Sequence, residues 1–228
     1  MDKIHDFSVH HMTWKNRKQN EVIIGEFRKY FPTIKYRLVS DAGDDYSDFI
    51  DKFNIEFKYY DVNIFKGGTL NTPEERKLWL QRIYETCQLF ETEWIVLFED
   101  DVLTKNNNFN IPTTDCAGAI SWHWNVELSI ELQKINNNTE NGYGMCGGSV
   151  FNRKIFMDIY NRYDEFPFDE LFNMDNRLKY SDAFITCLFQ YFGYTYSVWE
   201  CHGEKALPNY NKNNNYCFIH GYKEYYEV

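Results

Sequence analysis

Apolar side chains recur at helical spacing in two stretches of the first hundred residues. Residues 16–31 carry most of their large apolar side chains on one face, and Pro32 ends the pattern. Residues 72–75 (TPEE) supply an N-cap threonine, a proline at the first helical position and a capping-box glutamate, and the apolar stripe behind them continues to about Phe90. Two amphipathic helices are therefore expected in this part of the chain.

A short, uninterrupted apolar run, Trp94–Phe98, is bounded on both sides by charged residues. Such a run without alternation is typical of a central strand in a parallel sheet that is covered on both faces. Alternation of strands with the two helices predicts a Rossmann-like α/β fold, with a mostly parallel central sheet flanked by helices. Further strands are expected at residues 7–12, 34–39, 55–62, 116–122, 147–151 and 194–199.

The second half of the chain has one clear helical pattern. Ser181 is expected to cap a helix whose apolar face includes Phe184 and Leu188, and Gly193 is placed to end it. With 228 residues and no linker-like segment, we expect a single domain over residues 1–228.

Composition and charge exclude several classes of protein. The net charge of −10 opposes attraction to nucleic acid or to anionic lipid. No apolar run approaches the roughly 20 residues of a membrane span, and the N-terminus lacks the apolar core of a signal peptide, so a cytoplasmic location is expected. The six cysteines form no CxxC pair and are expected to be reduced and mostly buried.

Three consecutive carboxylates, Glu99, Asp100 and Asp101, follow the central strand directly. Ligands of open α/β sheets bind at the carboxyl ends of strands, and adjacent carboxylates suit a hard cation such as Mg²⁺ or Mn²⁺. A solvated acidic loop is the alternative interpretation.

A second acidic stretch, residues 39–45, also ends a strand. A carboxylate at Asp41 can accept hydrogen bonds from a nucleobase or a ribose, and the alternative is a simple Asx-type turn.

In their order along the chain, these motifs resemble metal-dependent glycosyltransferases of the GT-A fold, most closely the family 2 type. The resemblance rests on residues 7–17, on 39–48 (VSDAGDDYSD), on the DxD-like 99–101, on 144–153 (GMCGGSVFNR) with 166–170, and on 181–194. It implies a nucleotide-binding half over residues 1–101 and an acceptor-binding half with a C-terminal tail over residues 102–228.

The resemblance also implies roles for individual carboxylates. Asp41 would contact the base of the donor, and Glu99 or Asp100 its ribose. Asp101 would bind the Mn²⁺ or Mg²⁺ that bridges the donor diphosphate. Asp182 would be the catalytic base, although an aspartate in a first helical turn is also favoured by the helix dipole alone.

Three further side chains are candidates at the donor site. Trp14, at the end of the first strand, is expected to stack on the nucleobase, although a core tryptophan is the alternative. His220 resembles the C-terminal histidine that completes the metal shell in GT-A enzymes, and His202 is its competitor.

Flat aromatic rings beside polar groups suit the apolar faces of sugars. We therefore expect acceptor contacts at Trp122 and Trp124, and at Gly147 and Gly148, where absent side chains would admit close approach by substrate. Since 19% of the residues are aromatic, packing in the core is the alternative for each tryptophan.

The sequence thus predicts transfer of one sugar from a nucleotide sugar, expected to be UDP-linked, to a glycan or glycoprotein. Inversion follows if Asp182 is the base, and a retaining enzyme is the alternative. A glycan-binding domain without turnover is a second alternative. A sugar nucleotidyltransferase is disfavoured because no glycine-rich basic loop follows the first strand, and a processive synthase because its Gln/Arg-x-x-Arg-Trp signature is absent.

Overall fold

The computed structural model describes residues 6–64, 68–119, 122–137, 142–207, 210–212 and 214–224. Its centre is a seven-stranded sheet in the order β10-β6-β9-β4-β1-β2-β3. Neighbouring strands run parallel except for the two pairs made by β9. The strands are β1 (Phe7–Thr13), β2 (Lys35–Asp41), β3 (Glu56–Tyr60), β4 (Trp94–Phe98), β6 (Cys116–Gly118), β9 (Val150–Asn152) and β10 (Tyr196–Val198).

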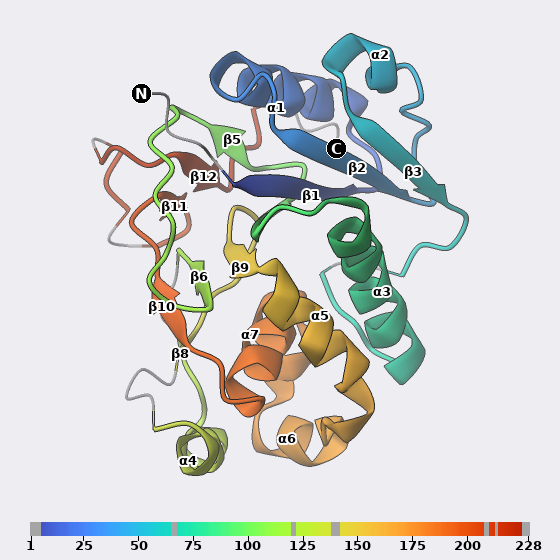
Figure 1. The fold of residues 1–228 in the computed structure, drawn as a ribbon. Helices are drawn as coiled ribbons and strands as arrows, with labels where there is room; N and C mark the ends of the chain where they lie inside the picture. The colour runs from blue at the N-terminus through green and yellow to red at the C-terminus, as the bar shows by residue number, and fades with distance from the viewer. Residues whose placement is uncertain are drawn as a thin grey trace.

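Helices cover both faces of this sheet. Figure 1 shows α1 and α2 on one side of β1 and β2, and α3 and α5 on the other, with α7 beside α5. The predicted α/β fold with a mostly parallel, helix-flanked sheet is therefore confirmed. The α-helices are α1 (Arg17–Tyr30), α2 (Phe49–Phe53), α3 (Pro73–Leu89), α4 (Val126–Ile135), α5 (Arg153–Asn161), α6 (Phe168–Met174) and α7 (Ser181–Tyr191).

The surroundings of strand β4 explain why its sequence is apolar without alternation. All five of its side chains are buried. Ile95 and Leu97 belong to the core cluster beneath α3, α5 and α7, whereas Trp94, Val96 and Phe98 belong to the cluster beneath α1. Both faces of the strand thus pack against helices, as a central parallel strand requires.

The predicted start of α3 is confirmed in detail. Glu75 donates its backbone N–H to Thr72 Oγ1 at 3.1 Å, and the Glu75 carboxylate accepts the Thr72 backbone N–H at 3.0 Å. Pro73 occupies the first helical position. This capping box satisfies amide groups that the first helical turn leaves without partners.

Three expectations in the second half need correction. The residue before α7 is Tyr180, and Ser181 is the first helical residue without a capping hydrogen bond. The strand expected at 116–122 ends at Gly118, and Trp122 belongs to a separate strand, while residues 120 and 121 lie outside the described residues. Gly147 and Gly148 form a turn before β9.

Two smaller sheets complete the fold. One has the order β11-β12-β5, and the other pairs β7 with β8. Strand β12 pairs in antiparallel register with β5, which follows the acidic turn at the end of β4, so the C-terminal strand lies beside that turn. These strands, which the sequence did not predict, are β5 (Leu103–Thr104), β7 (Trp122–His123), β8 (Gly142–Tyr143), β11 (His202–Glu204) and β12 (Phe218–His220).

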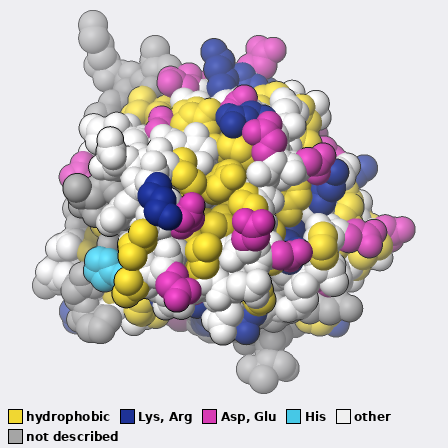
Figure 2. Space-filling model, turned by 90° about the horizontal axis from the view of Figure 1, so that it is seen from below, with side chains coloured by type: hydrophobic (Ala, Val, Ile, Leu, Met, Phe, Trp, Pro, Cys, Tyr) yellow, Lys and Arg dark blue, Asp and Glu magenta, His cyan; other side chains and the backbone are white. Residues whose placement is uncertain are grey.

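On the face in Figure 2, basic side chains of the described residues are interspersed with acidic and hydrophobic ones. None of the described helices is both long and apolar enough to cross a bilayer. All six cysteines are free and buried, as expected.

Candidate active site

The carboxyl ends of β1, β2 and β4 meet at a pocket of about 780 Å³. Parallel pairing of these strands brings their terminal residues to one edge of the sheet. All six residues predicted for the donor and the metal line this pocket, namely Trp14, Asp41, Glu99, Asp100, Asp101 and His220. Acids from separate stretches of the chain therefore converge at one place.

Three of these side chains form a candidate metal centre. His220 Nε2 lies 3.1 Å from Asp101 Oδ1 and 3.6 Å from Glu99 Oε2. One ligand atom from each residue lies within 4.8 Å of the other two. Two carboxylate oxygens and an imidazole nitrogen are a ligand set that Mn²⁺ accepts. Glu99, expected at the ribose, thus also lies with the metal candidates, and its contact with a ribose stays a prediction.

The second nitrogen of His220 contacts Glu204. The Glu204 carboxylate forms a short hydrogen bond with His220 Nδ1. Burial acts to raise the pKa of Glu204, but the hydrogen bond and charge of His220 outweigh it and lower that pKa to about 2. A carboxylate on Nδ1 fixes the proton there and leaves Nε2 as the ligand atom, as second-shell carboxylates do at many metal centres.

Polar and cationic side chains surround the acidic turn. Lys223 Nζ lies 3.5 Å from Asp101 Oδ2. Asn16 donates from Nδ2 to Asp100 Oδ2 at 2.8 Å, and its backbone has a φ of 67°, a left-handed conformation that is uncommon outside glycine. Asn16 and Lys223 are functional candidates that the sequence reasoning did not select. The position of Asn16 shortly after the end of β1 could have identified it as a candidate.

Trp14 presents its ring to this pocket. Its side chain is 48% exposed, which is unusual for tryptophan, and Lys15 Nζ lies 4.4 Å from the ring centroid. Asp44 donates its backbone N–H to the Trp14 carbonyl at 2.8 Å. A Cβ at Gly43 would lie 1.2 Å from that carbonyl oxygen, so only glycine allows the two loops to approach this closely. The backbone that carries the exposed ring is therefore fixed beside the pocket.

Asp41 has a partner from within the chain. It is only 2% exposed and forms an ion pair with Arg82 of α3. It also accepts the backbone N–H of Ile64 at 3.0 Å. Contact between Asp41 and a nucleobase stays a prediction, and such a base would compete with Arg82 for the carboxylate.

Asp182 lies in the first turn of α7 and accepts the backbone N–H of Ala183 at 2.7 Å. Burial and the negative charge of Glu99 raise the pKa of Asp182. The charge of Glu99, one of the metal candidates, thus acts on Asp182. A carboxylate with a raised pKa is a better proton acceptor than an ordinary surface aspartate.

The four residues expected at the acceptor separate into different environments. Trp122 is 47% exposed and stays a candidate platform. Trp124 does not fit this role, because it is buried, stacks on Tyr143 and donates its indole N–H to Gln190 Oε1 at 2.7 Å. Its ring is part of the core.

Gly147 and Gly148 are buried, and side chains of the same chain fill the space beside each of them. A Cβ at Gly147 would lie 2.8 Å from a Val102 methyl group and 3.2 Å from Glu99 Cβ. At Gly148, where φ is 92°, it would lie 2.7 Å from His202 Nε2. The glycines therefore admit neighbouring side chains, rather than the substrate that we expected.

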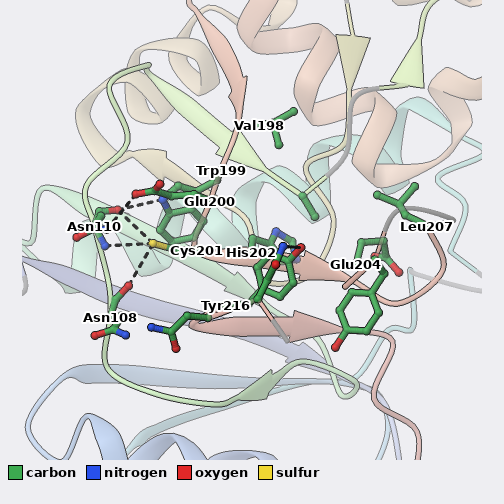
Figure 3. A pocket seen from close by; sticks show the side chains of 14 residues that line it. Asn108, Asn110, Val198, Trp199, Glu200, Cys201, His202, Glu204, Leu207 and Tyr216 are labelled. Atoms are coloured by element: carbon green, nitrogen blue, oxygen red, sulfur yellow. Dashed lines mark hydrogen bonds between the residues drawn. The ribbon is translucent and has the colours of Figure 1, made fainter. Parts of the chain in front are cut away.

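His202 points to a second pocket, of about 650 Å³. Figure 3 shows Asn108 and Asn110 at one end of this pocket and Glu204 and Leu207 at the other. Burial lowers the pKa of His202 to about 3, so its ring is neutral. Within the described part of the chain, the carboxylates of a metal centre gather at His220 and not at His202.

The comparisons with known proteins place the fold. No known protein family and no curated protein sequence matches the chain. Among solved structures, it resembles the galactosyltransferase LgtC in complex with donor and acceptor sugar analogs, with a TM-score of 0.55 and 12% identity over 93% of this chain and 86% of LgtC. An active-site mutant of LgtC gives a TM-score of 0.54 with the same identity and coverage. The glycosyltransferase GlyE of Streptococcus pneumoniae TIGR4 gives a TM-score of 0.47 at 11% identity, over 85% of this chain and 45% of GlyE. The chain thus has a fold of the GT-A-like glycosyltransferase kind.

Proposed function

We propose that this chain is a metal-dependent glycosyltransferase that moves one sugar from a UDP-sugar to a hydroxyl group of a glycan or glycoprotein. The observation that carries the proposal is the Glu99, Asp101 and His220 cluster, which lines the same pocket as the exposed Trp14 ring. Diphosphate and nucleobase of one donor would occupy these two parts of the pocket.

The chain's own residues account for donor binding. Glu99, Asp101 and His220 would hold Mn²⁺ or Mg²⁺, which when bound neutralises charge on the diphosphate leaving group. Lys223, beside Asp101, adds a second positive charge on the same side. Trp14 would stack on the base, with Asp41 and Asp100 as further donor contacts. The C-terminal residues His220 and Lys223 would therefore extend the nucleotide-binding half beyond residues 1–101.

Asp182 is proposed as the base that takes the proton from the attacking hydroxyl. Burial raises its pKa, which makes it a stronger proton acceptor than an ordinary aspartate. A base that activates the acceptor for direct displacement would give inversion of the anomeric configuration. Trp122 is proposed as the acceptor platform, since its ring is exposed.

The likeness to LgtC supports this reaction class through the fold. The LgtC structure was solved with donor and acceptor sugar analogs. For this chain we propose the transfer of a sugar from a donor to an acceptor saccharide, but not the particular sugar that LgtC transfers. The family 2 subtype and the cytoplasmic location belong to the same proposal.

The test is calorimetric titration with a panel of nucleotide sugars, with and without Mn²⁺. We expect one UDP-sugar to bind only with Mn²⁺, and Asp101→Asn to abolish that binding. Asp51→Asn, at an exposed position of α2, is the matched control and should bind like the wild type. Binding of no nucleotide under any condition would contradict the proposal.

A further inference from the structure

His220 belongs to a second cluster of potential ligands with a different chemistry. Cys146, Glu204 and His220 each offer one ligand atom within 4.8 Å of the other two. Cys146 Sγ lies 3.6 Å from Glu204 Oε2. The first cluster is made of oxygen and nitrogen ligands, whereas this one adds sulfur.

The sulfur-to-oxygen spacing of this cluster fits a tetrahedral soft-metal site, whereas the short Glu204–His220 Nδ1 contact would have to lengthen when a metal binds. With a Zn–S bond of about 2.3 Å and a Zn–O bond of about 2.0 Å, two ligands at a tetrahedral angle are about 3.5 Å apart. The observed sulfur-to-oxygen distance of 3.6 Å is close to that value. Thiolate sulfur prefers Zn²⁺ or Cd²⁺ to the hard ions Mg²⁺ and Mn²⁺.

Charge balance also favours a divalent ion here. Cys146 is a free, buried thiol. Coordination removes the proton from a ligating thiol outright. One thiolate and one carboxylate then neutralise a divalent cation, which removes most of the cost of burying each charge alone.

We propose that Cys146, Glu204 and His220 Nδ1 form an inhibitory site for a thiophilic divalent cation of the Zn²⁺ class. The inhibitory effect rests on the proposed function, whereas the metal site itself does not. Binding displaces the thiol proton and requires an unprotonated Nδ1. The imidazole keeps its remaining proton on Nε2.

That proton position is what makes the site inhibitory. Nε2 lies 3.1 Å from Asp101 Oδ1, and a protonated Nε2 donates to this oxygen and has no lone pair for a second metal. The two clusters therefore compete for one imidazole. Zn²⁺ at Cys146 would remove His220 from the Mn²⁺ site without occupying that site.

The two clusters are reached from different sides. His220, Asp101 and Glu99 line the donor pocket. Glu204 lines the second pocket, where Figure 3 shows its side chain opposite the asparagine end. A soft metal can thus approach Glu204 from this second pocket even when a nucleotide fills the first.

The direct test uses Cd²⁺, whose thiolate complexes give an ultraviolet charge-transfer band. Titration of the wild type should develop this band and reach its endpoint at one equivalent, and Cys146→Ser should remove it. Cys217→Ser is the matched control, because Cys217 is also buried and lies outside both clusters, and it should keep the band. A band that survives in Cys146→Ser, or that never forms in the wild type, overturns the site.

A second arm measures bound Mn²⁺ by electron paramagnetic resonance. One equivalent of Cd²⁺ or Zn²⁺ should weaken Mn²⁺ binding about tenfold or more in the wild type, and not in Cys146→Ser. Displacement of Mn²⁺ that is equal in both proteins contradicts competition through His220. If Mn²⁺ fails to bind at all while the Cd²⁺ band forms, the proposed function fails and the sulfur-containing site stands. Should Cys146→Ser not fold, as judged by circular dichroism, Cys146→Ala provides the same two readouts.

Discussion

His220 Nε2 lies 3.1 Å from Asp101 Oδ1. This contact connects β12, the last strand of the described chain, with the acidic turn that follows the central strand β4. The contact depends on pairing of β12 with β5, since β5 follows that turn directly. The candidate metal centre is therefore complete only when the C-terminal segment is folded against the sheet.

Trp14 and Trp122 are expected to act on different substrates. Trp14→Ala should raise the KM for the nucleotide sugar about tenfold, because base stacking on an aromatic ring is worth about 1–3 kcal/mol. Trp122→Ala should raise the KM for the acceptor and leave the donor KM unchanged. Steady-state kinetics with both substrates varied separates these effects. An equal change of both constants in either variant would refute the assignment.

Asp182→Asn should lower kcat about 10²–10⁴-fold if Asp182 is the base. Mn²⁺ and UDP binding should be unchanged, since Asp182 is not a proposed ligand of either. Because burial raises the pKa of Asp182, the acidic limb of the wild-type kcat profile should lie above the usual aspartate value of 3.8. Unchanged kcat in the variant would assign the proton acceptor elsewhere.

The same pKa shift predicts an effect on stability. Native Asp182 keeps its proton to a higher pH than it does in the unfolded chain, so the native state loses stability as pH rises from 3.8 through the raised value. Asp182→Asn removes this loss and should raise the melting temperature at neutral pH relative to the wild type. Calorimetry at pH 7 checks the sign, and a lower melting temperature would contradict it.

Arg82 and Asp41 form a buried ion pair, with side-chain exposures of 4% and 2%. Arg82→Met should lower the free energy of unfolding by about 3–5 kcal/mol, because it leaves Asp41 as an uncompensated buried charge. Arg162→Met is the control, since its ion pairs lie on the surface and their loss should lower the stability far less. Urea denaturation of both variants makes the comparison, and similar losses would show that the buried pair is not special.

Glu204 is expected to position His220 for the hard metal ion. Glu204→Gln should weaken Mn²⁺ binding about 10–100-fold, because the proton on Nδ1 is no longer held by a carboxylate. Glu204→Asp should recover part of that loss. The exposed neighbour Glu200 provides the control Glu200→Gln, which should leave Mn²⁺ binding as it is. Equal Mn²⁺ affinity in Glu204→Gln and the wild type would show that the contact has no such role.

The elements that the sequence predicted are those whose pattern follows from burial or capping alone. Strand β4 is apolar throughout because both faces are buried, and α3 begins where its capping box predicts. Helix α5 had a local signal that we did not use, since Asn152 caps it by accepting the N–H groups of Lys154 and Ile155. By contrast, β11 (His202–Glu204) contains no apolar side chain and β12 (Phe218–His220) only two, so neither forms an apolar run that predicts a strand.

The residues of the donor site could be predicted because they lie at strand ends, whereas the side chains that contact His220 could not. Asp101 belongs to the acidic turn that directly follows β4, so the position of its carboxylate could be predicted. Glu204 and Cys146 meet His220 only through tertiary pairing of short strands. Trp124 was misplaced because the strand ends at His123, after which the chain turns the indole toward Gln190.

The most direct test of the account is calorimetric titration of UDP into the wild-type protein with and without Mn²⁺. The account predicts saturable binding with Mn²⁺, and binding weaker by about 100-fold or more when Mn²⁺ is absent or when Asp101 is replaced by asparagine. Equal UDP affinity in all three cases would contradict the claim that Glu99, Asp101 and His220 hold a cation that binds the donor diphosphate.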